Sequence, residues 1–457
     1  MSPNKAVLLL CLGIGVAACR RPTTPERASD AADETLPDVP AKWAAAQEAV
    51  GDVQLAWVAS IGDDTLTELV RQAQANNKNL QASAAGVERS WALAQRAGAG
   101  LKPQLGVNAG TGSGGGVQAK PTGSQSLGLQ ASWELDVWGR IRSARQAAVM
   151  SAEAVEADYR FSQHSLAAAV ARGYFVAIEA GLQAEAAANS LETLKETQQI
   201  ATMRLESGVG TAQDVALAKS DMAMAQAASV AAEGSQRDAL RALEVLLGRY
   251  PSADMDLRKS LPSTPPPPGV PSEVLERRPD IVAAERRIAA AFNAVDEAKA
   301  ARLPRIGLTS GIGGSSGQLT NLLNPANLAW SVGANLVAPL LDGGAGKARV
   351  EIATAEQKQA VAAYGQAALE AFKEVESGLD QGVVLRERGI ALRQALEEAD
   401  VALGIAKLRH AEGEADMVDV LTMQRRVFAA RTSLLGVERA RLEQWIGLNL
   451  ALGGSWE

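Results

Sequence analysis

The second half of the chain repeats the first at a fixed distance. Glycines and aspartates of the first half recur 205 positions later, as for Gly208 and Gly413 (413 − 208). The pairs are Gly139 and Gly344, Gly208 and Gly413, Asp214 and Asp419, and Gly248 and Gly453. Solenoid repeats are roughly 20 to 50 residues long, so each copy must hold several secondary-structure elements. The chain is therefore a duplication, and we expect its function to lie in what the two copies enclose.

Composition narrows the class of protein. The length of 457 residues would suggest about three domains, but the repeat favours two intertwined halves. Aromatic residues make up only 4%, which indicates a core of small side chains between closely packed helices. The net charge of −7 and the pI near 5.3 argue against a nucleic-acid partner, because binding phosphates requires a basic stripe.

The N-terminus predicts the cellular compartment. Lys5 precedes an apolar run, 6–18, that is too short to span a bilayer and ends in small residues before Cys19. This pattern fits a bacterial signal peptide at 1–18, with Cys19 as the lipid-bearing first residue of the mature chain. The alternative is an ordinary signal peptide with an incidental cysteine. Arg20 follows Cys19 and favours sorting to the outer membrane.

The mature N-terminus is predicted to be a tether. Residues 20–42, rich in proline, threonine and charge, are typical of an extended linker. Cys11 is lost with the signal, so no cysteine remains for a disulfide or a metal site. We expect no cofactor and no metal, and only a covalent lipid on Cys19.

Two proline-free stretches predict long helices. No proline lies between 121 and 251 or after 339, and an interior proline would cost a helix about 3 kcal/mol. Within these stretches, apolar or small residues recur with alternating gaps of three and four, a period that indicates coiled-coil packing. The series are Val215, Ala218, Met222, Ala225, Ser229 and Ala232; Leu392, Leu396, Ala399, Leu403 and Ala406; and Val420, Met423, Val427, Ala430, Leu434 and Val437.

Each long helix is predicted to end at a glycine tip and to return as a second helix. Gly208 and Gly413 can supply the left-handed turn that stops a helix. Asp214 or Asp416 can cap the returning helix. Each half therefore contains a long helical hairpin.

Before each helical hairpin the apolar period changes to two. From Leu127 to Val137 every odd position is apolar and every even one is polar or glycine, which predicts a strand with two different faces. Residues 332–340 repeat this alternation. Weaker strands are predicted upstream, at 105–109 and 306–312. The glycine-rich segments 110–116 and 313–317 are predicted as flexible hairpin loops.

These strands predict a barrel that is shared between chains. About ten alternating residues are what a transmembrane β-strand requires, but four strands cannot close, and open sheet edges are not tolerated in lipid. Two protomers would supply eight strands and a filled bore, whereas three would supply twelve and leave a channel.

Several motifs resemble those of the TolC-like outer membrane factors, and more narrowly the NodT-type lipoproteins of resistance-nodulation-division (RND) efflux pumps. The motifs are Trp133 to Arg140 (WELDVWGR), Arg277 to Ile281 (RRPDI), Pro304, Pro339 to Gly344 (PLLDGG) and Gly453 to Trp456 (GGSW). The resemblance covers about residues 55–455. It implies a mixed, mainly α fold: a homotrimer with a helical periplasmic α-barrel and a shared twelve-stranded transmembrane β-barrel.

The function implied by the resemblance is passive conduction. The chain would be the outer membrane channel of a tripartite system, lipid-anchored with its helical tunnel in the periplasm. Substrates would come from an inner membrane RND-type pump through a periplasmic adaptor protein, and leave to the cell exterior past an iris-like periplasmic aperture. The alternative is a non-conducting coiled-coil lipoprotein scaffold, for which the alternating strands would have no use.

The sequence patterns and the resemblance together divide the chain. The predicted parts are a signal peptide at 1–18, a lipid-anchored tether at 19–54, a helical and equatorial segment at 55–100, a β-hairpin at 101–138, a long helical hairpin at 139–250, a Pro-rich equatorial linker at 251–272, a helix at 273–302, a second β-hairpin at 303–342, and a second long helical hairpin with the equatorial C-terminal end at 343–457.

By family position, Asp214, Asp416 and Asp419 would lie near the periplasmic mouth. Three copies of each in a narrow ring would repel one another, and could bias opening or hold cations. The alternative role is helix capping on a solvated surface. His410 stands where the family often has an aromatic residue, and Ala415 where some members have an arginine that ties the mouth shut.

The tips resemble the family's surface for the adaptor. The residues concerned are Leu205, Gly208, Val209 and Thr211 in the first copy and Leu408, Gly413 and Val418 in the second. The alternative is that they simply form turns. An enzyme is not expected, because His164 and His410 are isolated and a complete phosphate-binding loop is missing around Lys347.

Overall fold

The computed structural model describes residues 24–36, 43, 45, 56–114, 122–264, 277–322 and 324–456. The signal peptide, Cys19, most of the tether and part of the Pro-rich linker lie outside the described residues. The chain forms two compact units. The sheet unit comprises Met1–Leu36, Trp91–Ser151 and Ala284–Gly365, and the helical unit comprises Pro37–Ser90, Ala152–Ala283 and Gln366–Glu457.

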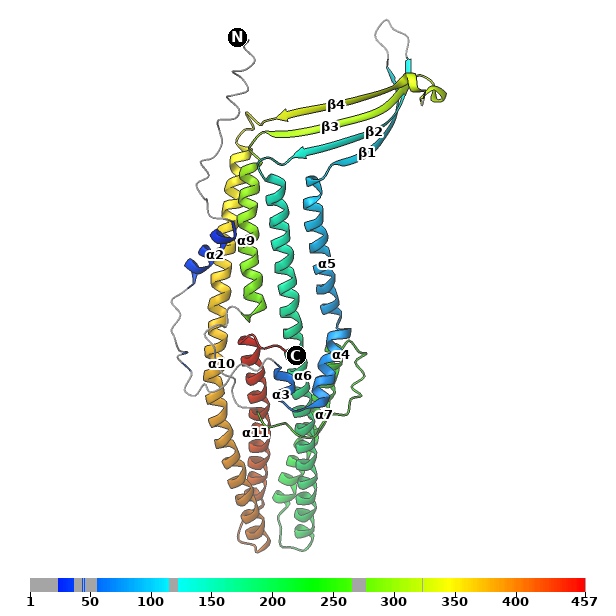
Figure 1. Cartoon of the computed structure of the whole chain (residues 1–457). Coiled ribbons are helices and arrows are strands. Elements are labelled where there is room, and N and C mark those ends of the chain that lie inside the picture. The colour runs from blue at the N-terminus through cyan, green and yellow to red at the C-terminus, as the bar shows by residue number, and fades with distance from the viewer. Residues whose placement is uncertain are drawn as a thin grey trace. The chain divides into compact units, whose positions relative to one another are not determined.

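The four long helices confirm the duplication (Figure 1). Helices α6 (Arg140–Glu206) and α10 (Ala345–Ala411) have 67 residues each, and α7 (Ala212–Leu246) and α11 (Met417–Ala451) have 35 each. Each pair begins at positions that differ by the 205 residues of the repeat. All six repeat glycines have positive φ angles, from 71° to 92°, a conformation that glycine adopts without steric cost.

Shorter helices are also found in the part of the chain that the structure describes. They are α2 (Thr24–Thr35), α3 (Trp57–Ser60), α4 (Asp64–Asn76), α5 (Lys78–Gly98) and α9 (Pro279–Ala300), with 3₁₀ turns η2 (Ala99–Leu101), η3 (Leu319–Asn321) and η4 (Pro325–Asn327).

Helix α2 corrects one prediction, because part of the expected extended tether is helical. Ala28 and Ala32 are both buried, at 5% and 3% exposure, and their spacing of four places them on one helical face. Arg27 forms an ion pair with Asp296 of α9 at 2.6 Å and lies over the ring of Phe292. These contacts with α9 explain why a polar sequence adopts a helix here.

The helical unit has a core of small and aromatic side chains. Alanines of α6 pack with Tyr174 and Phe175, and Trp57 meets Trp445 edge to face with ring centroids 6.2 Å apart. Near the tips a second cluster joins Val215 and Val420 with their coiled-coil neighbours. The predicted period of three and four therefore marks the buried faces of these helices.

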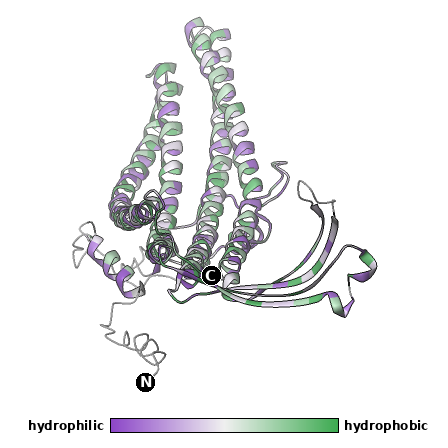
Figure 2. Cartoon of the chain, turned by 90° about the horizontal axis from the view of Figure 1, so that it is seen from above, coloured by the Kyte–Doolittle hydropathy of each residue, from purple (hydrophilic) through white to green (hydrophobic). Residues whose placement is uncertain are grey.

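The sheet unit contains one four-stranded antiparallel sheet in the order β1-β2-β3-β4. Its strands are β1 (Gln104–Gly114), β2 (Thr122–Leu135), β3 (Arg305–Ser316) and β4 (Leu328–Val337). The mainly helical fold class with four strands per chain is confirmed. The strands curve together, as Figure 2 shows from above.

Several strand predictions were wrong in their bounds. Residues 110–114 and 313–316, predicted as loops, continue β1 and β3 as paired strand. Gly110 lies beside the hydroxyl of Ser126, whereas Gly313 lies against the backbone of Leu127 and Gly128, where a side chain would not fit. The strand predicted at 332–340 ends at Val337 instead. Pro339, which has no N–H to donate, lies two residues further on.

Candidate functional site

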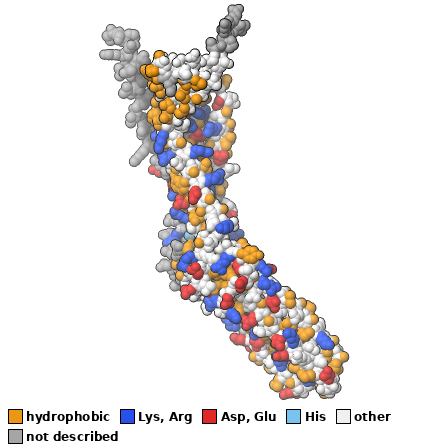
Figure 3. All heavy atoms as spheres, turned by 90° about the vertical axis from the view of Figure 1, so that its right-hand side faces the viewer, with side chains coloured by type: hydrophobic (Ala, Val, Ile, Leu, Met, Phe, Trp, Pro, Cys, Tyr) orange, Lys and Arg blue, Asp and Glu red, His pale blue; other side chains and the backbone are white. Residues whose placement is uncertain are grey.

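One face of the sheet is apolar and exposed. The register aligns Val107, Leu129, Ile312 and Trp330 in one row across all four strands. Their exposed fractions are 71%, 45%, 53% and 78%. Hydrophobic side chains gather over the sheet in Figure 3. An apolar patch of this extent marks contact with lipid or another protein.

The opposite face is polar but nearly uncharged. Glu134 and Arg305 are the only charged residues within the four described strands, and both lie at the ends near the long helices. Elsewhere this face carries asparagine, glutamine, serine, threonine and glycine.

On the polar face, glycines leave space that side chains of the neighbouring strand occupy. A Cβ at Gly128 would lie 3.1 Å from Asn108 Oδ1, one at Gly333 would lie 3.2 Å from Thr309 Oγ1, and one at Gly110 would lie 3.2 Å from Ser126 Oγ. The polar side chains thus lie against the strands. This arrangement thins the polar face, and a sheet that is thinner on one face can curve toward it.

Ion pairs and capping bonds fix the junction between strands and helices. Arg140 contacts both carboxylate oxygens of Glu134 at 2.9 Å and approaches Glu297 at 3.9 Å. Asp136 accepts the backbone N–H groups of Ile141 and Arg142 at 2.9 and 3.0 Å. Burial raises the pKa of Asp136, but these hydrogen bonds lower it overall.

Two tryptophans tie the linkers at this junction. Trp133 donates its indole N–H to Leu101 O at 3.1 Å, and Trp138 donates to Pro304 O at 2.7 Å. In the second copy, Asp342 accepts the N–H groups of Gly344 and Gly346 at 3.0 and 2.7 Å. The WELDVWGR and PLLDGG motifs are therefore strand-to-helix connections.

The first helical tip is closed by a capping box. Thr211 is the N-cap of α7: its Oγ1 accepts the Asp214 N–H, and its own N–H donates to the Asp214 carboxylate at 3.1 Å. Asp214 is therefore the third residue of the helix. The N-cap is Thr211 and not Asp214, which the sequence analysis had offered as a cap. Leu205 and Val209 expose 38% and 68% of their surface beside Gly208.

The second tip uses different contacts. Asp416 is the N-cap of α11, but its side chain makes no capping hydrogen bond. Asp419 is exposed in the first turn. His410 Nδ1 lies 2.9 Å from Ala415 O, and Arg204 of the first tip reaches His410 O at 3.4 Å.

The predicted tip residues of the second copy are also exposed. Leu408 and Val418 expose 61% and 44% of their surface beside Gly413. Apolar side chains that remain exposed at a turn are suited to contact with a partner.

The sequence analysis did not predict the residues that hold the helical unit together. Asp63, 8% exposed, caps α4 through Leu66 N and also accepts bonds from Tyr174 and Arg258 at 3.0 and 2.9 Å. Burial raises the pKa of Asp63, but these partners lower it overall. Burial and the same contact raise the pKa of Tyr174. The N-cap position of Asp63 was the only local signal in the sequence.

A sheet with an apolar outer face, on a chain made mainly of long helical hairpins, defines a membrane channel protein with a periplasmic helical part. The outer membrane efflux protein family model matches residues 69–249 and 270–454, and the chain belongs to this family. It is an outer membrane channel of an efflux system, and the non-conducting scaffold is not supported. The family is one of transport proteins.

Characterised relatives span the whole chain. It is 30% identical over 467 residues to the cation efflux system protein CusC of Escherichia coli O6:H1, with 100% of both chains covered. It is 31% identical to the pyoverdine export outer membrane protein OpmQ of Pseudomonas putida, covering 100% of this chain and 99% of OpmQ. The structure of the outer-membrane channel OprN matches with a TM-score of 0.83 and 30% identity, over 92% of this chain and 98% of OprN.

Proposed function

We propose that three copies of this chain form a closed channel that conducts substrates passively through the outer membrane. The observation that carries this proposal is the apolar row of Val107, Leu129, Ile312 and Trp330 on a sheet in which, among the described residues, each of the edge strands β1 and β4 has one unpaired edge. In lipid those edges must pair. Pairing β4 of one copy with β1 of the next closes the sheet, and twelve strands leave an open bore.

Two measurements test the assembly. The purified full-length protein in detergent should have the mass of a homotrimer, and paired cysteines placed on β1 and β4 should crosslink neighbouring copies. Reconstituted in a planar bilayer, it should carry ionic current. A monomer that never passes current would contradict the proposal.

The proposal includes two protein partners and a lipid anchor. An inner membrane pump of the RND type would supply the energy, a periplasmic adaptor would bind the tips, and the chain itself would need neither catalysis nor a cofactor. The exposed side chains of Leu205, Val209, Leu408 and Val418 support adaptor docking. A charged residue at Val209 should weaken crosslinking to the adaptor, whereas one at exposed Val230 of α7 should not.

The lipid on Cys19 anchors the mature chain in the outer membrane in this proposal. Cys19→Ala should abolish incorporation of radiolabelled palmitate. Labelling that persists in this variant would contradict the assignment.

Asp416 and Asp419 are proposed to act at the periplasmic aperture. Neither carboxylate makes a capping hydrogen bond, whereas Asp214 is held in its capping box. Substitution of Asp416 and Asp419 by alanine should therefore change cation preference more than Asp214→Ala does. Equal cation preference in all three variants would contradict a role of Asp416 and Asp419 at the aperture.

A further inference from the structure

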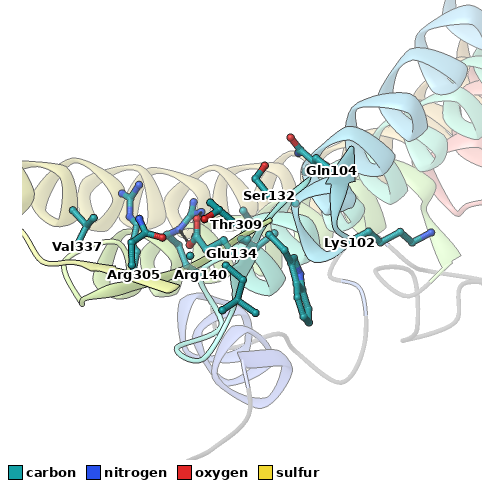
Figure 4. A pocket seen from close by; sticks show the side chains of 16 residues that line it. Lys102, Gln104, Ser132, Glu134, Arg140, Arg305, Thr309 and Val337 are labelled. Atoms are coloured by element: carbon teal, nitrogen blue, oxygen red, sulfur yellow. Dashed lines mark hydrogen bonds and ion pairs between the residues drawn. The ribbon is translucent and has the colours of Figure 1, made fainter. Parts of the chain in front are cut away.

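A cavity of about 600 Å³ at the base of the sheet has an excess of positive charge (Figure 4). Its lining includes the basic residues Lys102, Arg140 and Arg305 and a single carboxylate, Glu134. Glu134 is occupied by Arg140. Lys102 and Arg305 have no ion-pair partner among the residues that the structure describes.

A second cavity of about 690 Å³ continues the positive charge and shares Arg305. Its other charged lining residues are Lys299, Arg302, Asp342, Lys347 and Arg349. The carboxylate of Asp342 already accepts two backbone N–H groups. Lys347 and Arg349 are paired with Glu351 and Glu297, so the excess positive charge of this second cavity comes from Lys299, Arg302 and Arg305.

The strand register places Arg305 on the polar face of the sheet. Arg305 alternates with Ile306, which is paired with Leu135 and Leu336 on the apolar face. Lys102 ends the η2 turn with an extended backbone, φ −111° and ψ 151°, and lines the same cavity as Gln104, although its side chain in Figure 4 extends to the side, away from Arg305. In Figure 4 the side chains of Gln104, Ser132 and Arg305 point in the same direction.

We propose that Lys102 and Arg305 form a collar that binds the anionic groups, carboxylate or phosphate, of molecules passing through the channel. This inference rests on the proposed function, in which the polar face lines the bore. The guanidinium can hold such a group with two hydrogen bonds, and the amides of Gln104 and Asn335 and the hydroxyl of Ser132 in the same cavity offer neutral donors.

The collar differs in charge from the rest of the sheet. Away from Glu134 and Arg305 the described strands carry no charge, so this end is where the sheet wall distinguishes anions from cations. Charges on a wall act over several ångströms in a narrow bore and raise the local concentration of the opposite ion. The collar therefore favours substrates with an acidic group over bare metal cations.

Planar-bilayer recordings of the full-length protein test the collar. In a KCl gradient, Lys102→Gln/Arg305→Gln should lower the chloride-to-potassium permeability ratio about two-fold, and Arg305→Glu should lower it further. Citrate added to the bath should reduce the wild-type current and have a weaker effect on the double variant. The matched control is Arg71→Gln/Lys78→Gln, which removes two exposed charges from α4 and α5 and should behave as wild type.

The outcomes separate this inference from the proposed function. A wild-type protein that conducts, with unchanged permeability ratio and citrate block in the double variant, would overturn the collar alone. A wild type without any current would overturn the channel as well. If the variants differ from wild type only in bilayers containing phosphatidylglycerol, and not in phosphatidylcholine, these residues face lipid headgroups and the collar is also overturned.

Discussion

The two copies of the repeat make the same joint from different side chains. Asn77, just before α5, donates to Leu246 O at the end of α7 at 2.9 Å. Arg278, just before α9, donates to Ala451 O at the end of α11 at 3.2 Å. Both residues are buried, at 7% and 4% exposure. The duplication thus preserves which backbone groups are bound, whereas the group that binds them has diverged.

The chemical difference makes the second joint part of a charged network. Asn77 uses its remaining oxygen to cap α5 through Leu80 N. Arg278 instead binds Asp280 and Glu374 at 2.8 and 2.6 Å. Burial lowers the pKa of Arg278, but the two carboxylates raise it overall, so its charge is permanent. The second joint therefore links three helices, α9, α10 and α11.

The largest expected effect concerns the glycines beside these joints. A Cβ at Gly248 would lie 2.6 Å from Asn76 O, and one at Gly453 would lie 3.0 to 3.1 Å from Arg277. Added to the strain of a positive φ, this overlap should make Gly248→Ala cost about 3 kcal/mol. Gly453→Ala should cost less, and Gly208→Ala, with open space around it, about 1 kcal/mol. Thermal unfolding in detergent measures the order, and a costlier Gly208→Ala would contradict it.

The next largest effect is the difference in stability lost when each joint is removed. Arg278→Ala leaves Asp280 and Glu374 without their cation and should destabilise the protein by about 2 to 3 kcal/mol. Asn77→Ala removes one cap and one hydrogen bond and should cost about 1 to 2 kcal/mol. Arg241→Ala, an exposed pair with Asp238, is the control and should cost under about 0.5 kcal/mol. Equal losses at both joints would remove the distinction drawn between them.

Low pH should weaken the contacts of Asp63 in the helical unit. The pKa of Asp63 is lower in the folded state than its ordinary value of about 3.9. Its stabilising contribution is therefore complete above that value and is lost as the pH falls through the folded pKa. Asp63→Asn should unfold at a lower temperature at pH 7 and lose less stability than wild type on acidification. The neighbouring exposed Asp64→Asn should retain the wild-type pH profile.

The smallest effect concerns stability at the two tips. Asp214→Ala breaks a complete capping box and should cost about 1 kcal/mol. Asp416→Ala removes a side chain without a capping bond and should change stability by less than about half as much. Circular dichroism melting curves of the two variants would compare them, and a larger loss in Asp416→Ala would show that the tips are held differently.

The sequence predicted the parts of the fold that depend on local patterns. The spacing of the glycines placed the ends of α6 and α10, and the apolar periods identified the coiled-coil faces and the strands. The glycine segments of β1 and β3 were mistaken for loops because glycine usually weakens a strand. Here the atoms that lie against those glycines, such as Ser126 Oγ beside Gly110 and Leu127 O beside Gly313, come from another strand.

The fastening residues could not be predicted for a related reason. Asn77 and Leu246 are 169 positions apart, and Arg278 and Ala451 are 173 apart, so no local pattern connects them. Likewise, α2 forms because Arg27 meets Asp296 of a distant helix. The basic collar was missed because Lys102 and Arg305 are far apart in the sequence and come to line one cavity only through the fold of the sheet.

The equal lengths of the paired helices have a consequence for how the proposed trimer would meet its partners. Each hairpin has one arm of 67 residues and one of 35, so the turns of the two hairpins in a subunit can lie at the same level. Three subunits would then present six helical turns at one level. Turns of the first and second copy, which carry different side chains, would alternate around the rim. A partner with sixfold symmetry could engage every turn, and a threefold partner could select one kind by charge.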